Sequence, residues 1–542
     1  MARRNPAVVA YDWVYRVRGK QALGLAFLLG LLANLAFPPI WIWPALAAAL
    51  CGLVWLLDGA RATPRRGRAA FWRSFAFGFG YFLGGLHWIA AAFVVDASAH
   101  LTLIWMPLVL LPGGLALIFA LVMRLGYRFW NAGPARLVIF AIFFTLAEWI
   151  RGALFGLGGL PWNLPGMIWE PGGAVSQSAS IWGIYGLSLL TVIALAAPAA
   201  VFDTRPRGSL PSRVAPVLVA AIVFGAIWGW GARRLADIPV GAETISARLV
   251  DAGVPQSEKF EAGTAELLIQ RFRALSGPDD GSSPPIVIWP EGALPYYLFE
   301  WPEALDAVAD RIGDRRLIIG VARRQFDEAG EVSAYNSLAV LTGASALNGP
   351  LYVYDKHMLV PFGEFMPFGG LLEAIGLETL QNLSPGGWDA GPPPATVSIA
   401  GMPAFAPLIC YEAIFPGLAP AGLDRPSWLV NISNDSWFGA FLGPYQHAAQ
   451  ARYRTIEEGL PMARVAVGGT TGMIDAYGKW TAKGQSPDPD IYGPDPRGWE
   501  ARIVDAQIPQ SAPPTPYSRY RDGIFWLMFL SMGLAFLVLP RR

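Results

Sequence analysis

The sequence has 542 residues, of which 54% are hydrophobic and only 15% are charged, and its formal net charge is +1. A soluble protein of this size carries about a quarter charged residues, so much of this chain is expected to lie in lipid. The near-zero net charge excludes a broad basic surface of the kind that binds nucleic acid. The 22 tryptophans suit a protein with membrane–water interfaces, where amphipathic rings collect.

Apolar runs long enough to span a bilayer recur through the first part of the chain, and one more closes it. Residues 1–20 are basic and polar and lead into two successive apolar runs, so we expect no cleavable signal. The predicted domains are a transmembrane bundle over 1–235, a polar domain over 236–520 and a C-terminal transmembrane helix over 521–542. We predict about eight spans, at roughly residues 21–37, 40–58, 71–95, 101–124, 135–153, 178–202, 213–232 and 522–540.

Basic residues crowd alternate loops between these spans, which indicates the orientation of the chain. Both termini are expected in the cytoplasm, and the polar domain on the periplasmic side of a bacterial inner membrane. Arg151 is an exception, and we interpret it with Glu148 as a local ion pair at a helix end rather than as a functional pair. The residues that set the orientation are Arg3, Arg4, Arg16, Arg18, Lys20, Arg61, Arg65, Arg66, Arg68, Arg124, Arg128, Arg136, Arg205, Arg207, Arg213, Arg541 and Arg542.

Short apolar strands alternate with helical stretches in the polar domain, which predicts a layered α/β fold. The predicted helices cover 262–274, 302–312 and 447–458. The predicted strands cover 244–250, 285–289, 316–321, 337–341, 351–354, 404–409, 428–432 and 464–467, with a hairpin over 473–480.

An ionisable side chain follows each of three predicted strands: Glu291, Lys356 and Cys410. A strand that ends at a nucleophile places that side chain at the rim of a sheet, within reach of substrate. Cys51, the other cysteine of the chain, lies in a membrane run, so Cys410 is the candidate reactive thiol. The alternative is that Cys410 is a small buried hydrophobic residue, as most free cysteines are. A carboxylate, an ammonium and a thiol together suit acyl transfer through a thioester.

The motifs WPEGALP (289–295), YDKHMLVPFGE (354–364) and LICYE (408–412) resemble the Glu-Lys-Cys signature of the nitrilase superfamily. Spans on both sides of the domain, together with VNISNDSWFG (430–439) and GPYQH (443–447), resemble the apolipoprotein N-acyltransferase family. The resemblance covers nearly the whole chain. It implies a four-layer α-β-β-α sandwich carried by a bundle of eight transmembrane helices.

The resemblance also implies roles for particular residues. Glu291 would be the general base, Lys356 the lysine on the oxyanion side and Cys410 the nucleophile. The family pattern further places Glu364, Tyr411 and Glu412 beside the active site and Trp437 near the lipid entrance. Phe260 stands where the family pattern has tryptophan, after VPQSEK (254–259), which leaves aromatic character for lipid contact.

The implied reaction has two halves. Cys410 takes the sn-1 acyl chain of a phospholipid, typically phosphatidylethanolamine, and the α-amine of a diacylglyceryl-modified N-terminal cysteine on a lipoprotein then attacks the thioester. Apolar walls near the thiol are expected from Tyr296, Tyr297 and the residues up to Phe299, and from 362–372; the alternative for both stretches is ordinary core. We expect a monomer without a cofactor. We also expect no metal site, because Cys and His are few and lack ligand spacing.

Two other functions remain open on the sequence. A membrane-tethered nitrilase-type amidase would use the same Glu-Lys-Cys chemistry with water in place of the amine, although a tether requires one span rather than eight. A transporter or receptor with a non-catalytic outer domain would carry ionisable residues along its spans, and few lie away from the span ends.

Overall fold

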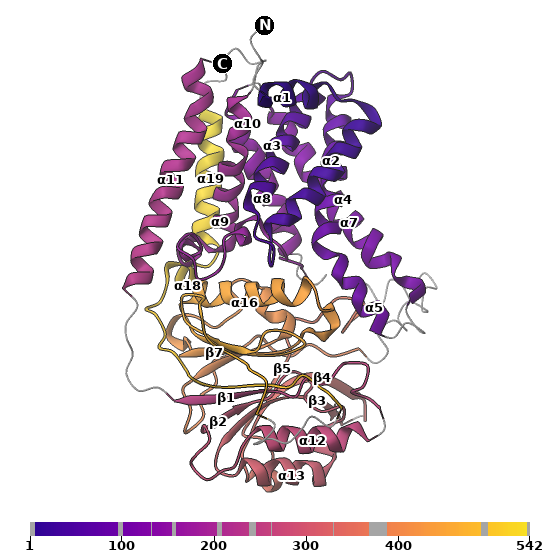
Figure 1. Ribbon diagram of the computed structural model, residues 1–542, viewed down its shortest axis with the longest axis vertical. Helices are drawn as coiled ribbons and strands as arrows, with labels where there is room; N and C mark the ends of the chain where they lie inside the picture. Colours follow the sequence, from indigo (N-terminus) through magenta and orange to yellow (C-terminus); the bar gives the residue numbers. More distant parts are fainter. Residues whose placement is uncertain are drawn as a thin grey trace.

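The computed structural model describes the chain except for residues 1–5, 96–100, 132, 154–158, 203–208, 238–244, 262, 329, 368–386, 489–496 and 539–542. A helical bundle occupies one half of the molecule and a mixed α/β domain the other (Figure 1). The bundle helices are α1 (Pro6–Arg16), α2 (Gly19–Ala33), α3 (Trp43–Ala60), α4 (Arg66–Leu86), α5 (Ala92–Val95), α7 (Leu111–Gly126), α8 (Arg136–Gly152), α9 (Ala179–Ala196), α10 (Pro198–Val201), α11 (Leu210–Ala236) and α19 (Gly523–Val538).

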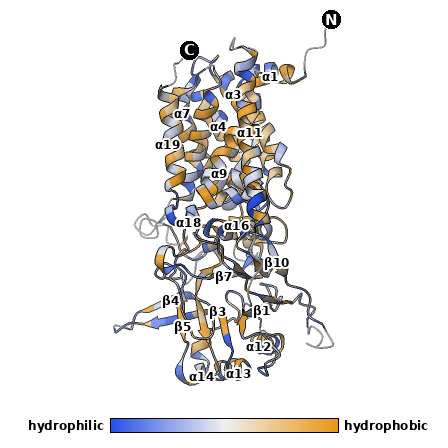
Figure 2. Cartoon of the chain, turned by 90° about the vertical axis from the view of Figure 1, so that its left-hand side faces the viewer, coloured by the Kyte–Doolittle hydropathy of each residue, from blue (hydrophilic) through white to orange (hydrophobic). Residues whose placement is uncertain are grey.

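The bundle confirms the predicted helical transmembrane region, for which the predicted count of about eight spans is approximate. Helices α8 and α19, of 17 and 16 residues, run beside the longer helices. Hydrophobic residues predominate along the bundle helices in Figure 2. Six segments are long and apolar enough to cross a membrane among the residues that the structure describes: Gly19–Ala36, Trp43–Ala60, Arg66–Val94, Met106–Phe129, Val175–Val201 and Leu210–Ala236.

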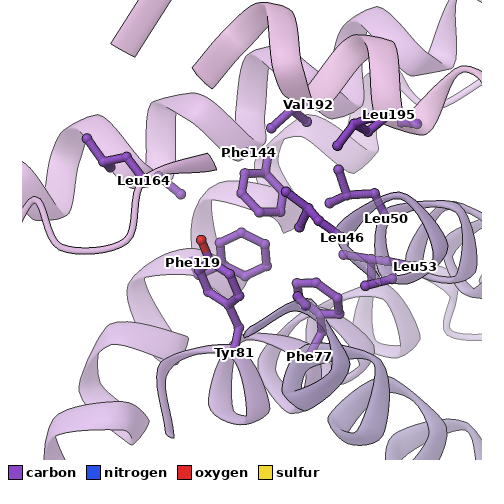
Figure 3. Packing of buried hydrophobic residues seen from close by; sticks show 14 of the residues in the cluster. Leu46, Leu50, Leu53, Phe77, Tyr81, Phe119, Phe144, Leu164, Val192 and Leu195 are labelled. Atoms are coloured by element: carbon purple, nitrogen blue, oxygen red, sulfur yellow. The ribbon is translucent and has the colours of Figure 1, made fainter. Parts of the chain in front are cut away.

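Aromatic rings and small residues pack the centre of the bundle. Phe119 of α7 lies 6.1 Å from Phe77 of α4 and 5.0 Å from Phe144 of α8, measured between ring centroids, and leucines of α3 close the cluster (Figure 3). Helices α2 and α4 approach closely because a glycine on each helix, Gly30 and Gly80, faces the backbone of the other helix. A Cβ atom on Gly80 would lie 2.2 Å from the carbonyl oxygen of Phe27, so this contact admits only glycine.

The α/β domain contains two sheets. The six-stranded sheet has the order β11-β1-β2-β3-β4-β5 and the five-stranded sheet the order β10-β9-β8-β7-β6. Strands β1, β2 and β3 are parallel to one another, as are β6, β7 and β8, and the remaining pairs are antiparallel. The strands are β1 (Ser246–Asp251), β2 (Ile286–Ile288), β3 (Arg316–Phe326), β4 (Val332–Leu341), β5 (Tyr352–Asp355), β6 (Phe405–Ile409), β7 (Trp428–Asn434), β8 (Met462–Val467), β9 (Gly472–Ile474), β10 (Trp480–Lys483) and β11 (Arg502–Gln507).

The two sheets pack face to face between layers of helices, which confirms the predicted nitrilase-like α-β-β-α sandwich. Buried residues of both sheets form one cluster, which includes Ile288 of β2, Ile318 of β3 and Ile432 of β7. Helices α12 (Thr264–Leu275) and α13 (Pro302–Ile312) cover the outer face of the six-stranded sheet. Helix α16 (Gly443–Glu458) packs on the five-stranded sheet, and the short helices are α14 (Ser345–Asn348) and α18 (Pro516–Tyr520).

Helix α16 lies between the five-stranded sheet and the bundle (Figure 1). Its Tyr453 donates a hydrogen bond to the carbonyl oxygen of Gly166, 2.9 Å away, and its Glu457 accepts the backbone N–H of Ile184 on α9 at 2.8 Å. The predicted i, i+3 ion pair between Glu148 and Arg151 is present at the end of α8, and both side chains are buried. The buried hydrogen bonds of Tyr453 and Glu457 fix the α/β domain on the bundle, because an unpaired polar group there would be costly.

Candidate active site

Glu291, Lys356 and Cys410 come together at one edge of the two sheets. Glu291 follows β2 and Lys356 follows β5 in the six-stranded sheet, whereas Cys410 directly follows β6 in the five-stranded sheet. The Lys356 ammonium lies 3.2 Å from Oε1 of Glu291, and both charges act on the Cys410 thiol. All three side chains are buried, with exposed fractions of 8%, 1% and 6%.

The two glutamates and the lysine are joined by an asparagine that the sequence analysis did not identify. Asn336 of β4 donates its amide to Oε1 of Glu291 at 2.7 Å and to Oε1 of Glu364 at 2.9 Å. Lys356 also donates to Glu364, 2.7 Å away. The predicted neighbour Glu364 therefore holds the lysine and the asparagine in place. The position of Asn336 in the middle of a strand could have predicted a role in the site, because a buried polar side chain requires a hydrogen-bond partner.

Asn434, at the end of β7, supplies the second oxygen of Glu291 with a donor. Its backbone N–H lies 2.8 Å from Oε2 of Glu291, and its side-chain amide donates to Gln256 at 2.9 Å. Both carboxylate oxygens of Glu291 thus receive hydrogen bonds, which fixes the direction of the side chain. The VNISNDSWFG motif contains this residue, although the motif alone does not show the contact with Glu291.

The electrostatics of the site favour an ionised Glu291 carboxylate beside a neutral Cys410 thiol. Burial opposes ionisation of Glu291, but the charge of Lys356 and the Asn336 hydrogen bond prevail and hold its pKa below the usual value. The pKa of Lys356 is raised by the two carboxylates despite its burial. Burial, with the negative charge of Glu291, raises the pKa of Cys410, while Lys356 acts in the opposite direction. A proton on sulfur beside a carboxylate ready to accept it is the resting state that general-base activation of a thiol requires.

The turn that carries the thiol is held by Glu412. Cys410 has a φ of +50°, a left-handed conformation that a residue with a side chain rarely adopts. Oε2 of Glu412 accepts the Ile409 N–H at 2.6 Å, and Oε1 accepts the Tyr354 hydroxyl at 2.6 Å. Burial raises the pKa of Glu412, and it is fully enclosed. Its contacts maintain the sharp strand-to-helix turn that presents Cys410.

Tyr411 connects this turn to the membrane bundle. Its hydroxyl donates to the carbonyl oxygen of Gly159, 2.8 Å away, in the segment that follows α8. Arg151 of α8 donates to the carbonyl oxygens of Leu160 and Trp162 in the same segment. The residue next to Cys410 is therefore anchored to the segment at the end of α8.

The aromatic residues predicted to contact lipid lie in different surroundings. Trp437 is 40% exposed, and its neighbour Phe438 packs on Trp88 of the bundle with ring centroids 4.9 Å apart. Phe260 is 70% exposed, beside Lys259, whose ammonium donates to the Gly292 carbonyl oxygen next to Glu291.

Tyr296 packs against the hydrophobic cluster on the helix-covered side of the six-stranded sheet, and Tyr297 contacts Arg324 of β3. The ring of Tyr296 lies 4.4 Å from that of Trp301, and the guanidinium of Arg324 lies 4.3 Å from the ring centroid of Tyr297. A role for these tyrosines in lipid binding stays a prediction. The wall predicted over 362–372 lies outside the described residues from 368 onward.

Cys51 is buried in the bundle and separate from this site. Its sulfur lies 3.5 Å from the carbonyl oxygen of Leu195 on α9, and neither cysteine forms a disulfide. Cys410 is therefore the thiol placed beside ionised groups.

Comparisons with known proteins agree with this architecture. Residues 29–197 match the family model of the apolipoprotein N-acyltransferase N-terminal domain, and residues 285–490 match that of carbon-nitrogen hydrolases. A solved amidase from Nesterenkonia sp. is matched at 13% identity over 54% of this chain and 98% of its own, with a TM-score of 0.33. The two family matches define the chain as a membrane protein that carries a carbon-nitrogen hydrolase domain.

Relatives that match nearly the whole chain identify the family within this class of membrane proteins. The apolipoprotein N-acyltransferase of Rhodopseudomonas palustris is 36% identical over 527 residues, which cover 94% of this chain and 92% of the relative. That of Caulobacter vibrioides is 36% identical over 528 residues, covering 96% and 95%. The chain belongs to the apolipoprotein N-acyltransferase family and is a bacterial membrane protein.

Proposed function

We propose that this chain transfers an acyl chain from a phospholipid to the α-amine of diacylglyceryl lipoproteins through a thioester on Cys410. The observation that carries the proposal is the placement of the thiol. It lies beside an ionised glutamate and a lysine, on a turn that Tyr411 ties to the membrane bundle. An acyl donor confined to a bilayer requires a nucleophile held against membrane helices.

The first half-reaction begins with attack of the Cys410 sulfur on the sn-1 ester carbonyl of the phospholipid, phosphatidylethanolamine being the expected donor. Glu291 takes the thiol proton, and the lysine ammonium of Lys356 stabilises the negative charge that develops on the carbonyl oxygen. The ester C–O bond then breaks, and Glu291 returns the proton to the departing glycerol oxygen. The products are lysophospholipid and the acyl thioester of Cys410.

The second half-reaction uses the lipoprotein amine as nucleophile. The neutral α-amine attacks the thioester carbonyl, Glu291 accepts a proton from nitrogen, and the C–S bond breaks. Glu291 then protonates the departing thiolate, which restores the starting state. The same residue serves as base and acid in each half, as the symmetry of a ping-pong reaction requires.

The proposal places the domain over 236–520 on the periplasmic side of the inner membrane, with both termini in the cytoplasm. The basic loops support this orientation. Helix α1 and the C-terminal end of α19 lie at the end of the bundle opposite the α/β domain (Figure 1), as expected if both termini are on the other side of the membrane.

The test is a transfer assay with purified protein, phospholipid and a synthetic diacylglyceryl peptide. With a free α-amine on the peptide we expect a third acyl chain on it, detected by mass. The same peptide with an acetylated α-amine is the matched control and should gain none. Release of free fatty acid at the same rate with either peptide would instead support an amidase-like hydrolase.

A further inference from the structure

His447 of α16 contacts the backbone of the nucleophile. Its Nε2 atom lies 3.1 Å from the carbonyl oxygen of Cys410, and its side chain is fully buried. A carbonyl oxygen only accepts hydrogen bonds, so Nε2 carries the proton in this contact. The histidine therefore acts on the main chain of Cys410 and is not placed as a base for its sulfur.

Buried charges hold the opposite side of the ring. Nδ1 of His447 lies 2.8 Å from Oδ1 of Asp435, and Oδ2 of Asp435 accepts Nη2 of Arg464 at 2.6 Å. Although burial disfavours the carboxylate, Arg464 and His447 lower the pKa of Asp435 to about 2, so it stays ionised. These contacts leave the imidazole a single orientation.

The membrane bundle holds the same part of α16. The ring of Trp162 lies 5.7 Å from that of His447. The side-chain oxygen of Gln446, the preceding residue, accepts the indole N–H of Trp162 at 2.7 Å and that of Trp88 at 3.2 Å. The Gln446 amide donates to the carbonyl oxygen of Pro38 at 3.3 Å. Three separate membrane segments thus converge on the residue next to His447.

The backbone of Cys410 requires such support. A φ of +50° is unfavourable for a residue with a Cβ atom and persists only where the surroundings fix it. Glu412 accepts the N–H of Ile409, which lies in the peptide between Leu408 and Ile409, and Nε2 of His447 contacts the carbonyl oxygen of the peptide that follows Cys410. Rotation of the peptide that follows Cys410 would change the ψ angle of Cys410 and with it the direction of the thiol toward Glu291.

We propose that His447 is a positioning residue for acyl transfer, which fixes the Cys410 carbonyl and links the direction of the thiol to the membrane bundle through Trp162 and Gln446. The proposal rests on the function proposed above for its substrate, but the geometry of the thiol is independent of that substrate. A small alkylating reagent that reacts with the same thiol therefore reports on the positioning separately.

Two amide variants distinguish the contact of Nε2 with Cys410 from the contact of Nδ1 with Asp435. In His447→Gln the amide nitrogen reaches the position of Nε2 and keeps the donor to Cys410. In His447→Asn the shorter amide reaches only the position of Nδ1, so the contact with Asp435 survives and the donor to Cys410 is lost. Both variants lose the ring itself, which makes each the control for the other.

Acylation of Cys410 by phospholipid, alkylation of Cys410 by iodoacetamide and thermal unfolding are measured for both variants. We expect His447→Asn to lose about tenfold in both rates, the effect of one hydrogen bond, at an unchanged half-saturating phospholipid concentration. His447→Gln should stay within about threefold of the native rates, with the same unfolding temperature as His447→Asn. Equal rates in the two variants, whether native or reduced, would overturn the proposal.

Comparing phospholipid with iodoacetamide distinguishes a failure of the proposed acyl transfer from a failure of the positioning role. If phospholipid forms no adduct on the native chain but the alkylation rates still differ as expected, the proposed function fails and the positioning role stands. If neither histidine variant folds, Trp162→Phe decides, since it removes the N–H that Gln446 accepts and keeps a smaller aromatic ring beside His447. Slower alkylation of that variant supports the link to the bundle, and an unchanged rate overturns it.

Discussion

Replacing Glu291 by glutamine tests the base while nearly preserving shape. Glu291 receives the Asn336 amide at 2.7 Å and Lys356 at 3.2 Å on one oxygen, and the Asn434 N–H at 2.8 Å on the other. In Glu291→Gln the new amide nitrogen must face one of these donors. Leaving a buried donor without an acceptor costs about 1–3 kcal/mol of unfolding free energy.

The loss of the base adds a separate effect on rate. General-base catalysis contributes at least about a hundredfold, which corresponds to about 2.7 kcal/mol at 1.36 kcal/mol per factor of ten. We therefore expect acylation of Cys410 by phospholipid to slow by about a hundredfold or more, measured by intact mass and expressed per folded molecule.

Glu300→Gln is the matched control, because Glu300 forms an exposed ion pair with Arg324 away from the thiol. This control should acylate at the native rate. An acylation rate of Glu291→Gln close to that of the control would refute the role of Glu291.

Three further predictions concern the lysine, a buried aspartate and the orientation. Lys356→Met should slow acylation by about a hundredfold and slow alkylation of Cys410 at neutral pH, since Lys356 lowers the thiol pKa; a native rate in both assays would contradict this. Burial raises the pKa of Asp251 to about 7, so the native state retains a proton that the unfolded state loses above about pH 4. Stability then falls as pH rises from about 4 to 7, and Asp251→Asn should remove that part of the fall in unfolding temperature; an unchanged pH dependence would contradict it. In a chain without native cysteines, an impermeant thiol reagent applied to intact cells should label a cysteine at Leu347, which is 92% exposed, and spare one at Ser209; the reverse pattern would contradict the orientation.

Three residues of the candidate site could be predicted from the sequence because each follows a buried strand. Runs such as Ala404–Ile409 identify a strand by composition, and the residue after such a strand lies at the sheet edge. Glu291, Lys356 and Cys410 were found in this way and do lie together. Asn336 was missed because it lies within β4, where its orientation depends on strand pairing.

Contacts between segments that are distant in the chain could not be predicted from the sequence. Strand β11 pairs antiparallel with β1, with Ser246 opposite Gln507, and a single short strand gives no sign of so distant a partner. Tyr296 follows Glu291 closely in the chain, but the turn after β2 places it on the α13 side of the sheet, against Trp301. His447 ends the GPYQH motif, but the motif does not predict its contact with the Cys410 carbonyl, because that contact depends on how α16 packs between the sheet and the bundle.

The most direct test is the lifetime of the acyl group on Cys410, followed by intact mass with phospholipid as the only substrate. Lysophospholipid must leave before the lipoprotein enters, so the thioester has to resist water in the interval, as a thiol that is only 6% exposed would allow. The account predicts a long-lived adduct on Cys410 that disappears when a diacylglyceryl peptide with a free α-amine is added, and none in Cys410→Ser. An adduct that hydrolyses quickly without the amine, or one that persists after the amine is added, would contradict it.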